Sequence, residues 1–371
     1  MRFHITRREE NFEVRCFASG LRTVVAAVVA LTALGILIGC SSSKATHLAY
    51  VAGGVNSVSA YRIDDRSGIA SILVGSPYVA GNSPSSVVVH PSGRFLYVAN
   101  QADSTISLYT INSTTGALTE ILPRAPAGGL SPGFMTMDSG GSFLFVANQV
   151  SNDVWAFQIG TAGALTPVSP VSSVSVGSSP AGLDLTSSGF LYVPVPNFSA
   201  IAVLSVNSSG ALQFVGSSPV SNGVAGIAVD SGAKFLYATN PAVNAVSGFN
   251  IQSDGSLVAV PGLTFGTGTT PVAALVDPTG SFLYVANSAS TSISQFKIDT
   301  TTGALTAFPT TTVSVGTNPA FMVTDPGGKF VYVGNTGSKS VTELTINSNG
   351  SLTNSNTIDV GFVPRSFAAT K

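Results

Sequence analysis

The chain has 371 residues, of which 44% are hydrophobic and only 9% are charged, with a formal net charge of −1. A typical globular protein carries about 25% charged residues, so this surface offers little field for steering a charged partner. The sequence has no basic stripe and no interleaving of basic and aromatic residues, and we therefore expect no nucleic-acid partner.

The N-terminal segment has the layout of an export signal. Several arginines precede an apolar run over residues 23–39, which is shorter than the roughly 20 residues that span a bilayer. The run ends in LIGC, which resembles the lipobox of bacterial lipoproteins. We therefore expect residues 1–39 to be a lipoprotein signal peptide, Cys40 to carry the lipid and residues 40–46 to form a short tether. The alternative is an uncleaved anchor helix with a chance cysteine.

This hypothesis also predicts where the protein resides. It would be exported and held at a membrane through the lipidated Cys40. The neutral Ser41 that follows resembles the pattern sorted to the outer membrane, so we expect the periplasmic face of that membrane or the cell surface. The only other cysteine, Cys16, is lost with the leader, so the folded domain has no disulfide.

From residue 47 onward the sequence repeats a short aromatic motif seven times. FLYVAN stands at residues 95–100 and again, unchanged, at residues 282–287. The central aromatic residues lie 47, 48, 47, 45, 47 and 48 positions apart: Tyr50, Tyr97, Phe145, Tyr192, Tyr237, Tyr284 and Tyr332. A period of roughly 40 to 50 residues that holds several short strands is typical of a β-propeller blade.

Each repeat carries four strand signals in the same order. In the second repeat, Pro84 opens an apolar run, the turn HPSG leads into FLYVAN, STISLYTI alternates as a third strand, and NSTTGALT turns at Gly116 into a fourth. We expect the glycine of this last turn to adopt a positive φ in every repeat. Aspartates recur in the turn before FLYVAN, and we interpret them as closing that turn rather than as calcium ligands: Asp138, Asp230, Asp277 and Asp325.

The two ends of the repeat region complement each other. The first repeat lacks the proline-led strand, and that strand stands at the C-terminus as PRSFAATK. We predict that this segment pairs with residues 48–52 and closes the ring, which leaves no unpaired lateral edge. The sequence therefore predicts an all-β protein, a seven-bladed β-propeller of four-stranded antiparallel blades over residues 47–371. We expect it to be a monomer.

Two sets of residues are expected at the mouth of the central channel. The first set follows each opening proline and holds one charge, Arg365, among small or uncharged residues: Ser85, Gly133, Ala181, Ala225, Val272, Ala320 and Arg365. The second set ends the second strand of five blades: Asn100, Asn148, Asn240, Asn287 and Asn335. A ring of carboxamides at a water-filled mouth would bind a polar, uncharged ligand such as a sugar. In the alternative interpretation, each asparagine caps its own turn.

The sequence offers few groups for catalysis. General acid–base chemistry needs a titratable group within hydrogen-bond reach of the reacting atom. Of three histidines, His4 lies in the leader, His47 begins the domain and His90 occupies a turn at the opposite end of the blade from the mouth. No cluster has metal-ligand spacing and no nucleophile motif is present. We therefore expect no metal and no cofactor.

The pattern P-x5-DP-x-G-x-FLYVAN, followed by S-x-S-x-[YF]-x-I and TGALT, resembles the seven-bladed lactonase family. That family includes 6-phosphogluconolactonase-like and cyclase-like propellers, and the pattern is also similar to the YVTN-type repeats of surface-layer and secreted propellers. The resemblance covers nearly all of residues 47–371 and implies the propeller fold. Members with lactone chemistry carry histidine, glutamate and arginine around the channel mouth, and of these this sequence supplies Arg365.

Two functional hypotheses follow. The first is a non-catalytic, lipid-tethered propeller, a binding or scaffold module that offers its uncharged face to a partner protein or glycan of the cell envelope. The second is a hydrolase of a neutral lactone or related ring compound, in which Arg365 polarises the carbonyl and a water attacks. A phosphorylated sugar acid would require several cations, so we do not expect it as the substrate.

Overall fold

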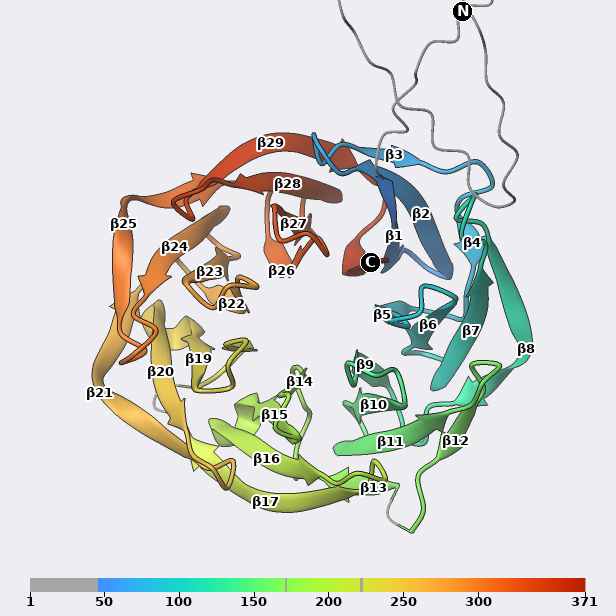
Figure 1. The fold of residues 1–371 in the computed structure, drawn as a ribbon, viewed down its shortest axis with the longest axis horizontal. Helices are drawn as coiled ribbons and strands as arrows, with labels where there is room; N and C mark the ends of the chain where they lie inside the picture. Colours follow the sequence, from blue (N-terminus) through green and yellow to red (C-terminus); the bar gives the residue numbers. More distant parts are fainter. Residues whose placement is uncertain (1–45, 171, 221–222, 371) are drawn as a thin grey trace, which may run out of the picture. The chain divides into compact units, whose positions relative to one another are not determined.

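The computed structural model describes residues 46–170, 172–220 and 223–370. The expected signal peptide, Cys40 and the tether up to residue 45 lie outside the described residues. Figure 1 shows seven β-sheets arranged as a ring around a central channel, with the innermost strand of each sheet facing the channel. The predicted seven-bladed propeller of antiparallel blades is confirmed.

Every blade runs from an innermost strand at the channel to an outermost strand at the rim, and we name the blades A to G in chain order. The first four blades contain β30 (Pro364–Ala369), β1 (Thr46–Gly53), β2 (Ser57–Asp64), β3 (Ala70–Ile72) and β4 (Tyr78–Val79) in A; β5 (Pro84–Val89), β6 (Phe95–Asn100), β7 (Thr105–Ile111) and β8 (Leu118–Pro126) in B; β9 (Pro132–Met137), β10 (Phe143–Asn148), β11 (Asp153–Ile159), β12 (Leu165–Pro167) and β13 (Ser173–Ser175) in C; β14 (Asp184–Leu185), β15 (Phe190–Val195), β16 (Ala200–Val206) and β17 (Leu212–Pro219) in D. The last three contain β18 (Ile227–Val229), β19 (Phe235–Asn240), β20 (Ala245–Ile251) and β21 (Leu257–Gly266) in E; β22 (Pro271–Val276), β23 (Phe282–Asn287), β24 (Ser292–Ile298) and β25 (Leu305–Ser314) in F; β26 (Pro319–Thr324), β27 (Phe330–Asn335), β28 (Ser340–Ile346) and β29 (Leu352–Asp359) in G. Two short 3-10 helices, η1 (Pro196–Phe198) and η2 (Pro241–Val243), follow β15 and β19.

The C-terminal strand closes the ring as the sequence predicts. β30 pairs antiparallel with β1, from Ala49 opposite Ala369 to Gly53 opposite Pro364. Blade A therefore joins strands from both ends of the described chain (Figure 1). Because this pairing supplies blade A with its innermost strand, no lateral edge of the ring is left open.

The repeated aromatic residues connect each blade to the next. In six of the seven repeats the buried tyrosine hydroxyl donates to the carbonyl of the turn glycine in the following blade, at 2.7 to 3.1 Å. The pairs are Tyr50 with Gly116, Tyr97 with Gly163, Tyr192 with Gly255, Tyr237 with Gly303, Tyr284 with Gly350, and Tyr332 with Gly68. Blade C carries Phe145 at this place and has no hydroxyl to donate.

The same glycine explains the phenylalanine that opens the motif. Gly163 has a φ of 82°, as expected for this turn, and an added Cβ would lie 2.9 Å from the ring of Phe95 in the preceding blade. Gly303 stands in the same relation to Phe235, at 2.5 Å. FLYVAN therefore recurs because its phenylalanine packs on the turn glycine of the next blade and its tyrosine bonds to the same residue.

The recurrent aspartates close their own turns. Oδ1 of Asp277 accepts the backbone N–H groups of Ser281 and Phe282 at 2.8 and 2.7 Å, and Oδ1 of Asp325 accepts those of Lys329 and Phe330, both at 2.6 Å. This is the role that the turn interpretation assigns to them.

Candidate functional site

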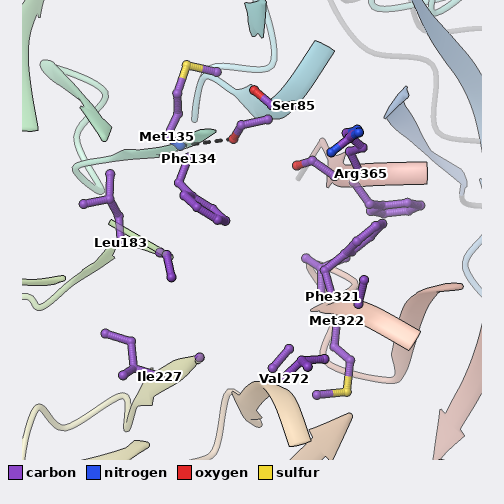
Figure 2. Close-up of a pocket in the computed structure, with 18 of the residues that line it drawn as sticks. Ser85, Phe134, Met135, Leu183, Ile227, Val272, Phe321, Met322 and Arg365 are labelled. Atoms are coloured by element: carbon purple, nitrogen blue, oxygen red, sulfur yellow. Dashed lines mark hydrogen bonds between the residues drawn. The ribbon is translucent and has the colours of Figure 1, made fainter. Parts of the chain in front are cut away.

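The innermost strands are linked to one another across the blade boundaries. Ser86 Oγ accepts the backbone N–H of Met135 at 3.1 Å, a bond drawn as a dashed line in Figure 2. Ser366 Oγ accepts the N–H of Val87 at 3.1 Å. Several polar side chains around the channel are therefore already engaged with the edge of a neighbouring strand.

These strands enclose a cavity of about 430 Å³ in the channel, which we call the deep cavity. All seven blades contribute to its lining. Figure 2 shows apolar side chains around the opening, with the ring of Phe134 pointing toward its middle and Leu183 and Ile227 beside it. The lining side chains are therefore mostly hydrocarbon.

A second cavity, of about 480 Å³, lies at the channel mouth. Its lining includes the polar side chains of Gln101, Gln149 and Thr336. The two cavities adjoin, since they share five lining residues: Ser85, Phe134, Ala320, Phe321 and Arg365. Gln101 Nε2 donates to Gln149 Oε1 at 2.7 Å, which holds the amides of blades B and C together at the rim.

Arg365 is the only charged residue that lines either cavity within the described part of the chain. It is exposed, and its guanidinium makes no hydrogen bond or ion pair with another described residue. Because a guanidinium presents a planar set of N–H donors that suits carboxylate and carbonyl oxygens, the mouth holds one unengaged anion-binding group.

A β-bulge places Arg365 at the mouth. Pro364 pairs with Gly53 and Ser366 pairs with Ala52, so Arg365 is the extra residue between two ladder positions. A bulge of this kind frees a side chain to be aimed away from the sheet. The same irregularity recurs at the start of the innermost strands of blades B, C, F and G. Of the seven residues in the first predicted set, all except Ala225 line one or both cavities.

The structure places the five asparagines elsewhere. All are buried, and none lines the deep cavity or the mouth among the described residues. Asn100 Nδ2 donates to the hydroxyls of Thr105 and Ser107, both at 3.1 Å. Asn287 and Asn335 bond to the corresponding hydroxyls of their own blades. Each carboxamide that has these bonds ties the second strand of its blade to the third.

A glycine 19 positions before each of four asparagines makes room for the carboxamide. An added Cβ would lie 2.5 to 2.8 Å from the asparagine side chain in each pair: Gly81 with Asn100, Gly129 with Asn148, Gly268 with Asn287, and Gly316 with Asn335. This constant spacing is a sequence signal that marks the asparagines as part of the blade packing.

Sequence reasoning missed the polar residues that do line the mouth. Gln101, Gln149 and Thr336 each stand one position after a repeat asparagine. Since side chains alternate in direction along an extended chain, the residue after the buried asparagine faces the opposite way. A scan of the position after each repeat asparagine would have found all three.

Other titratable groups lie away from both cavities. His47 Nδ1 is 2.7 Å from Asp65 Oδ1, and His90 Nε2 is 2.9 Å from the carbonyl oxygen of Gly141. Asp184 is the only acidic residue of the innermost strands. Its Oδ2 accepts the backbone N–H of Val229 at 2.8 Å, and burial raises its pKa to about 6.

The described residues contain no group of three or more His, Cys, Asp or Glu side chains that could hold a metal ion. Nor does the described part of the chain include a helix long and apolar enough to cross a membrane.

Comparison with known proteins identifies the family. The profile described as "Lactonase, 7-bladed beta-propeller" matches residues 42–178 and 217–323. The chain belongs to this lactonase family. No curated protein matches the sequence.

Solved structures of family-like propellers share the fold at low identity. A candidate 6-phosphogluconolactonase from Bacteroides fragilis is 20% identical with a TM-score of 0.77, and the match covers 90% of this chain and 100% of that one. The periplasmic gluconolactonase PpgL of Pseudomonas aeruginosa is 20% identical with a TM-score of 0.74, over 88% and 99% of the two chains. At this identity the likeness extends to the fold alone.

Proposed function

We propose that this lactonase-family propeller is a non-catalytic binding module whose channel mouth holds an organic ligand by a carbonyl or carboxylate group. One observation carries the proposal: Arg365 is exposed at the mouth with no partner among the described residues. A concave site with one convergent charged group is the usual form of a small-molecule pocket, and both cavities fall in the range of roughly 300 to 1,000 Å³.

The surrounding charge limits the ligand to a neutral molecule or a monoanion. A phosphate group is usually held by several cationic or N–H donors. Arg365 alone supplies positive charge to the two cavities among the described residues. Phosphorylated sugar lactones are therefore poor candidates.

The proposed setting is the cell envelope. The export signal and the lipid on Cys40 would tether the propeller to a membrane, on the periplasmic face of the outer membrane or at the cell surface. The name of the Pseudomonas aeruginosa neighbour describes that protein as periplasmic, which supports an exported location for this chain as well. An envelope protein or glycan that presents a carboxylate would then meet the propeller at the mouth cavity.

The test is calorimetry with neutral lactones and small carboxylates, on the wild-type protein and on Arg365→Ala. We expect binding that Arg365→Ala weakens at least tenfold. The matched control is Arg66→Ala, which removes an exposed arginine from the turn between β2 and β3. If no compound binds, or if the two variants behave alike, the proposal fails.

A second candidate is hydrolysis of a neutral lactone, which family membership favours. Arg365 would polarise the carbonyl, and a water molecule would attack it. Turnover above buffer that Arg365→Ala abolishes and Arg66→Ala leaves intact would replace the binding proposal with this one.

A further inference from the structure

The side chains that line the channel differ between its mouth and its interior. At the mouth, the glutamines, Thr336 and Arg365 supply hydrogen-bonding side chains. Deeper in, most of the lining side chains are hydrocarbon, among them Leu183 and Ile227. A ligand that reaches both regions therefore meets several polar side chains at one end and mostly hydrocarbon side chains at the other.

Three serines line the deep cavity, and each already has a backbone partner. The hydroxyl of Ser85 donates to the carbonyl of Pro132 at 2.7 Å. Ser86 and Ser366 accept the N–H groups of Met135 and Val87 and keep their own O–H donors. A polyhydroxylated ligand would lose its water hydrogen bonds there and could replace only a few of them through these three side chains, and leaving a buried hydroxyl unpaired is unfavourable.

We propose that the ligand is an amphiphile with one carboxylate or lactone carbonyl as its head and an unbranched apolar tail. The head lies at Arg365, and the tail passes Phe134 into the deep cavity. Figure 2 shows the geometry: Arg365 and the ring of Phe321 lie on one side of the opening, and the ring of Phe134 enters from another. This proposal deepens the proposed function and rests on it, because it needs a head group bound at Arg365.

Tail length gives the proposal a quantitative signature. Burial of one methylene contributes about 0.8 kcal/mol, which corresponds to about a fourfold change in affinity. A series of straight-chain acids should therefore bind about fourfold more tightly for each added carbon until the deep cavity is filled. A polyol acid of similar length should gain nothing from its extra carbons.

The test is calorimetry of butanoate, hexanoate, octanoate and gluconate, each below its micellar concentration. Residues 44–371 are suitable for this experiment because the ring is closed by its own strands and its core clusters begin at Leu48. We expect affinity to rise along the fatty-acid series and gluconate to bind no more tightly than butanoate. Equal affinities along the series, or tightest binding of gluconate, would overturn the amphiphile proposal while Arg365-dependent binding stands. If no acid binds in an Arg365-dependent way, the proposed function itself fails.

A substitution that fills the deep cavity tests binding of the apolar tail separately from binding of the head group. Ala181 lines that cavity and is partly exposed to it. Ala181→Phe should abolish the gain from hexanoate to octanoate and leave butanoate binding within about twofold of wild type. Ala307→Phe, on the exposed outer strand β25, is the matched control and should leave the whole series unchanged. A chain-length dependence that survives Ala181→Phe would contradict placement of the tail in the deep cavity.

Discussion

Two junctions of the ring differ at one buried position. At the junction of blades F and G, Gln295 on β24 donates from Nε2 to the carbonyl of Thr310 at 3.1 Å and accepts the N–H of Leu352 at 2.5 Å. Glu343 occupies the same place on β28, where blade G meets blade A. It is fully buried, and neither carboxylate oxygen has a hydrogen-bond partner among the described residues.

The difference makes the junction of blades G and A, which we call the closing junction, sensitive to pH. Burial raises the pKa of Glu343 to about 7, whereas the ordinary value is 4.5. The folded state therefore holds the proton more tightly than the unfolded chain. The stability that this proton provides is fully present below pH 4.5 and is lost as the pH rises through about 7. The junction of blades F and G has a neutral amide at this position, and the junction of blades G and A has an acid that burial favours in its protonated form.

The largest expected effect comes from filling the space between Glu343 and the next blade. Gly68 has a φ of 73°, and an added Cβ would strike the Glu343 carboxylate and the ring of Phe330. Gly68→Ala combines an unfavourable backbone conformation with overpacking, so we expect a loss of about 3 kcal/mol in the free energy of unfolding. Urea denaturation measures it. Gly216→Ala is the control, since no atom lies within 4 Å of its Cβ position, and it should change stability by less than about 0.5 kcal/mol.

Glu343→Gln should remove the sensitivity of the closing junction to pH. A raised pKa of about 7 corresponds to at most about 3 kcal/mol of destabilisation in wild type at pH 8. The variant should therefore be more stable than wild type at pH 8 by about 1 to 3 kcal/mol and should show no such gain at pH 4.5. Urea midpoints at several pH values between 4.5 and 8.5 report the difference.

Glu120→Gln is the matched control, because Glu120 is the other glutamate of the described residues. Its Oε1 lies 2.7 Å from Nε of Arg124 near the surface, and such pairs contribute at most about 1 kcal/mol. We expect its unfolding curve to keep the wild-type dependence on pH. If Glu343→Gln also keeps that dependence, Glu343 does not set it.

The reverse exchange, Gln295→Glu, should make the F–G junction resemble the closing one. The carboxylate can still accept the N–H of Leu352, but it cannot donate to the carbonyl of Thr310, and burial disfavours its charge. We expect a loss of about 1 to 2 kcal/mol at pH 8 that shrinks at pH 5. A loss that is the same at both pH values would show that shape, and not charge, distinguishes the two junctions.

The propeller architecture could be predicted from the sequence because equivalent contacts between blades use the same residue types in each repeat. Tyr284 bonds to Gly350 of the next repeat, and the same residue types recur wherever the same contact forms. The mouth was harder to predict. The place of Arg365 depends on a bulge that only the pairing of Pro364 and Ser366 reveals, and the repeated asparagines face into the blade rather than into the channel. Glu343 is buried in contact with Gly68, which belongs to the first repeat and lies 275 positions earlier in the sequence.

Removal of the tyrosine hydroxyl at each junction should have a smaller effect on stability. It tests whether the two junctions differ in anything besides Gln295 and Glu343. The hydroxyls of Tyr284 and Tyr332 each donate to a glycine carbonyl across their junction, at 2.7 and 3.1 Å. Tyr284→Phe and Tyr332→Phe should each cost about 1 kcal/mol, since each leaves a carbonyl without its buried partner. Thermal and urea unfolding at pH 5 measure both. Unequal costs at that pH would mean that the junctions differ in more than the acid.

Blade C provides the complementary experiment with the smallest expected effect. Phe145 occupies the tyrosine position and is fully buried. The turn glycine of the next blade, Gly210, has a φ of 80°, within the range of 73° to 85° of the other six turn glycines. Phe145→Tyr adds a hydroxyl at the position from which the tyrosines of the six other blades bond to the equivalent turn glycine. We expect a gain of about 0.5 to 1 kcal/mol in the free energy of unfolding, measured with urea. Phe157→Tyr on the same blade is the control and should give no gain.

If Phe145→Tyr destabilises the protein, there is no room for a hydroxyl beside Gly210, and the bond between tyrosine and glycine depends on the shape of each junction. If it stabilises the protein by the amount that Tyr284→Phe loses, the bond is a modular part of the repeat, and the contrast between Gln295 and Glu343 is left as the feature that sets the closing junction apart.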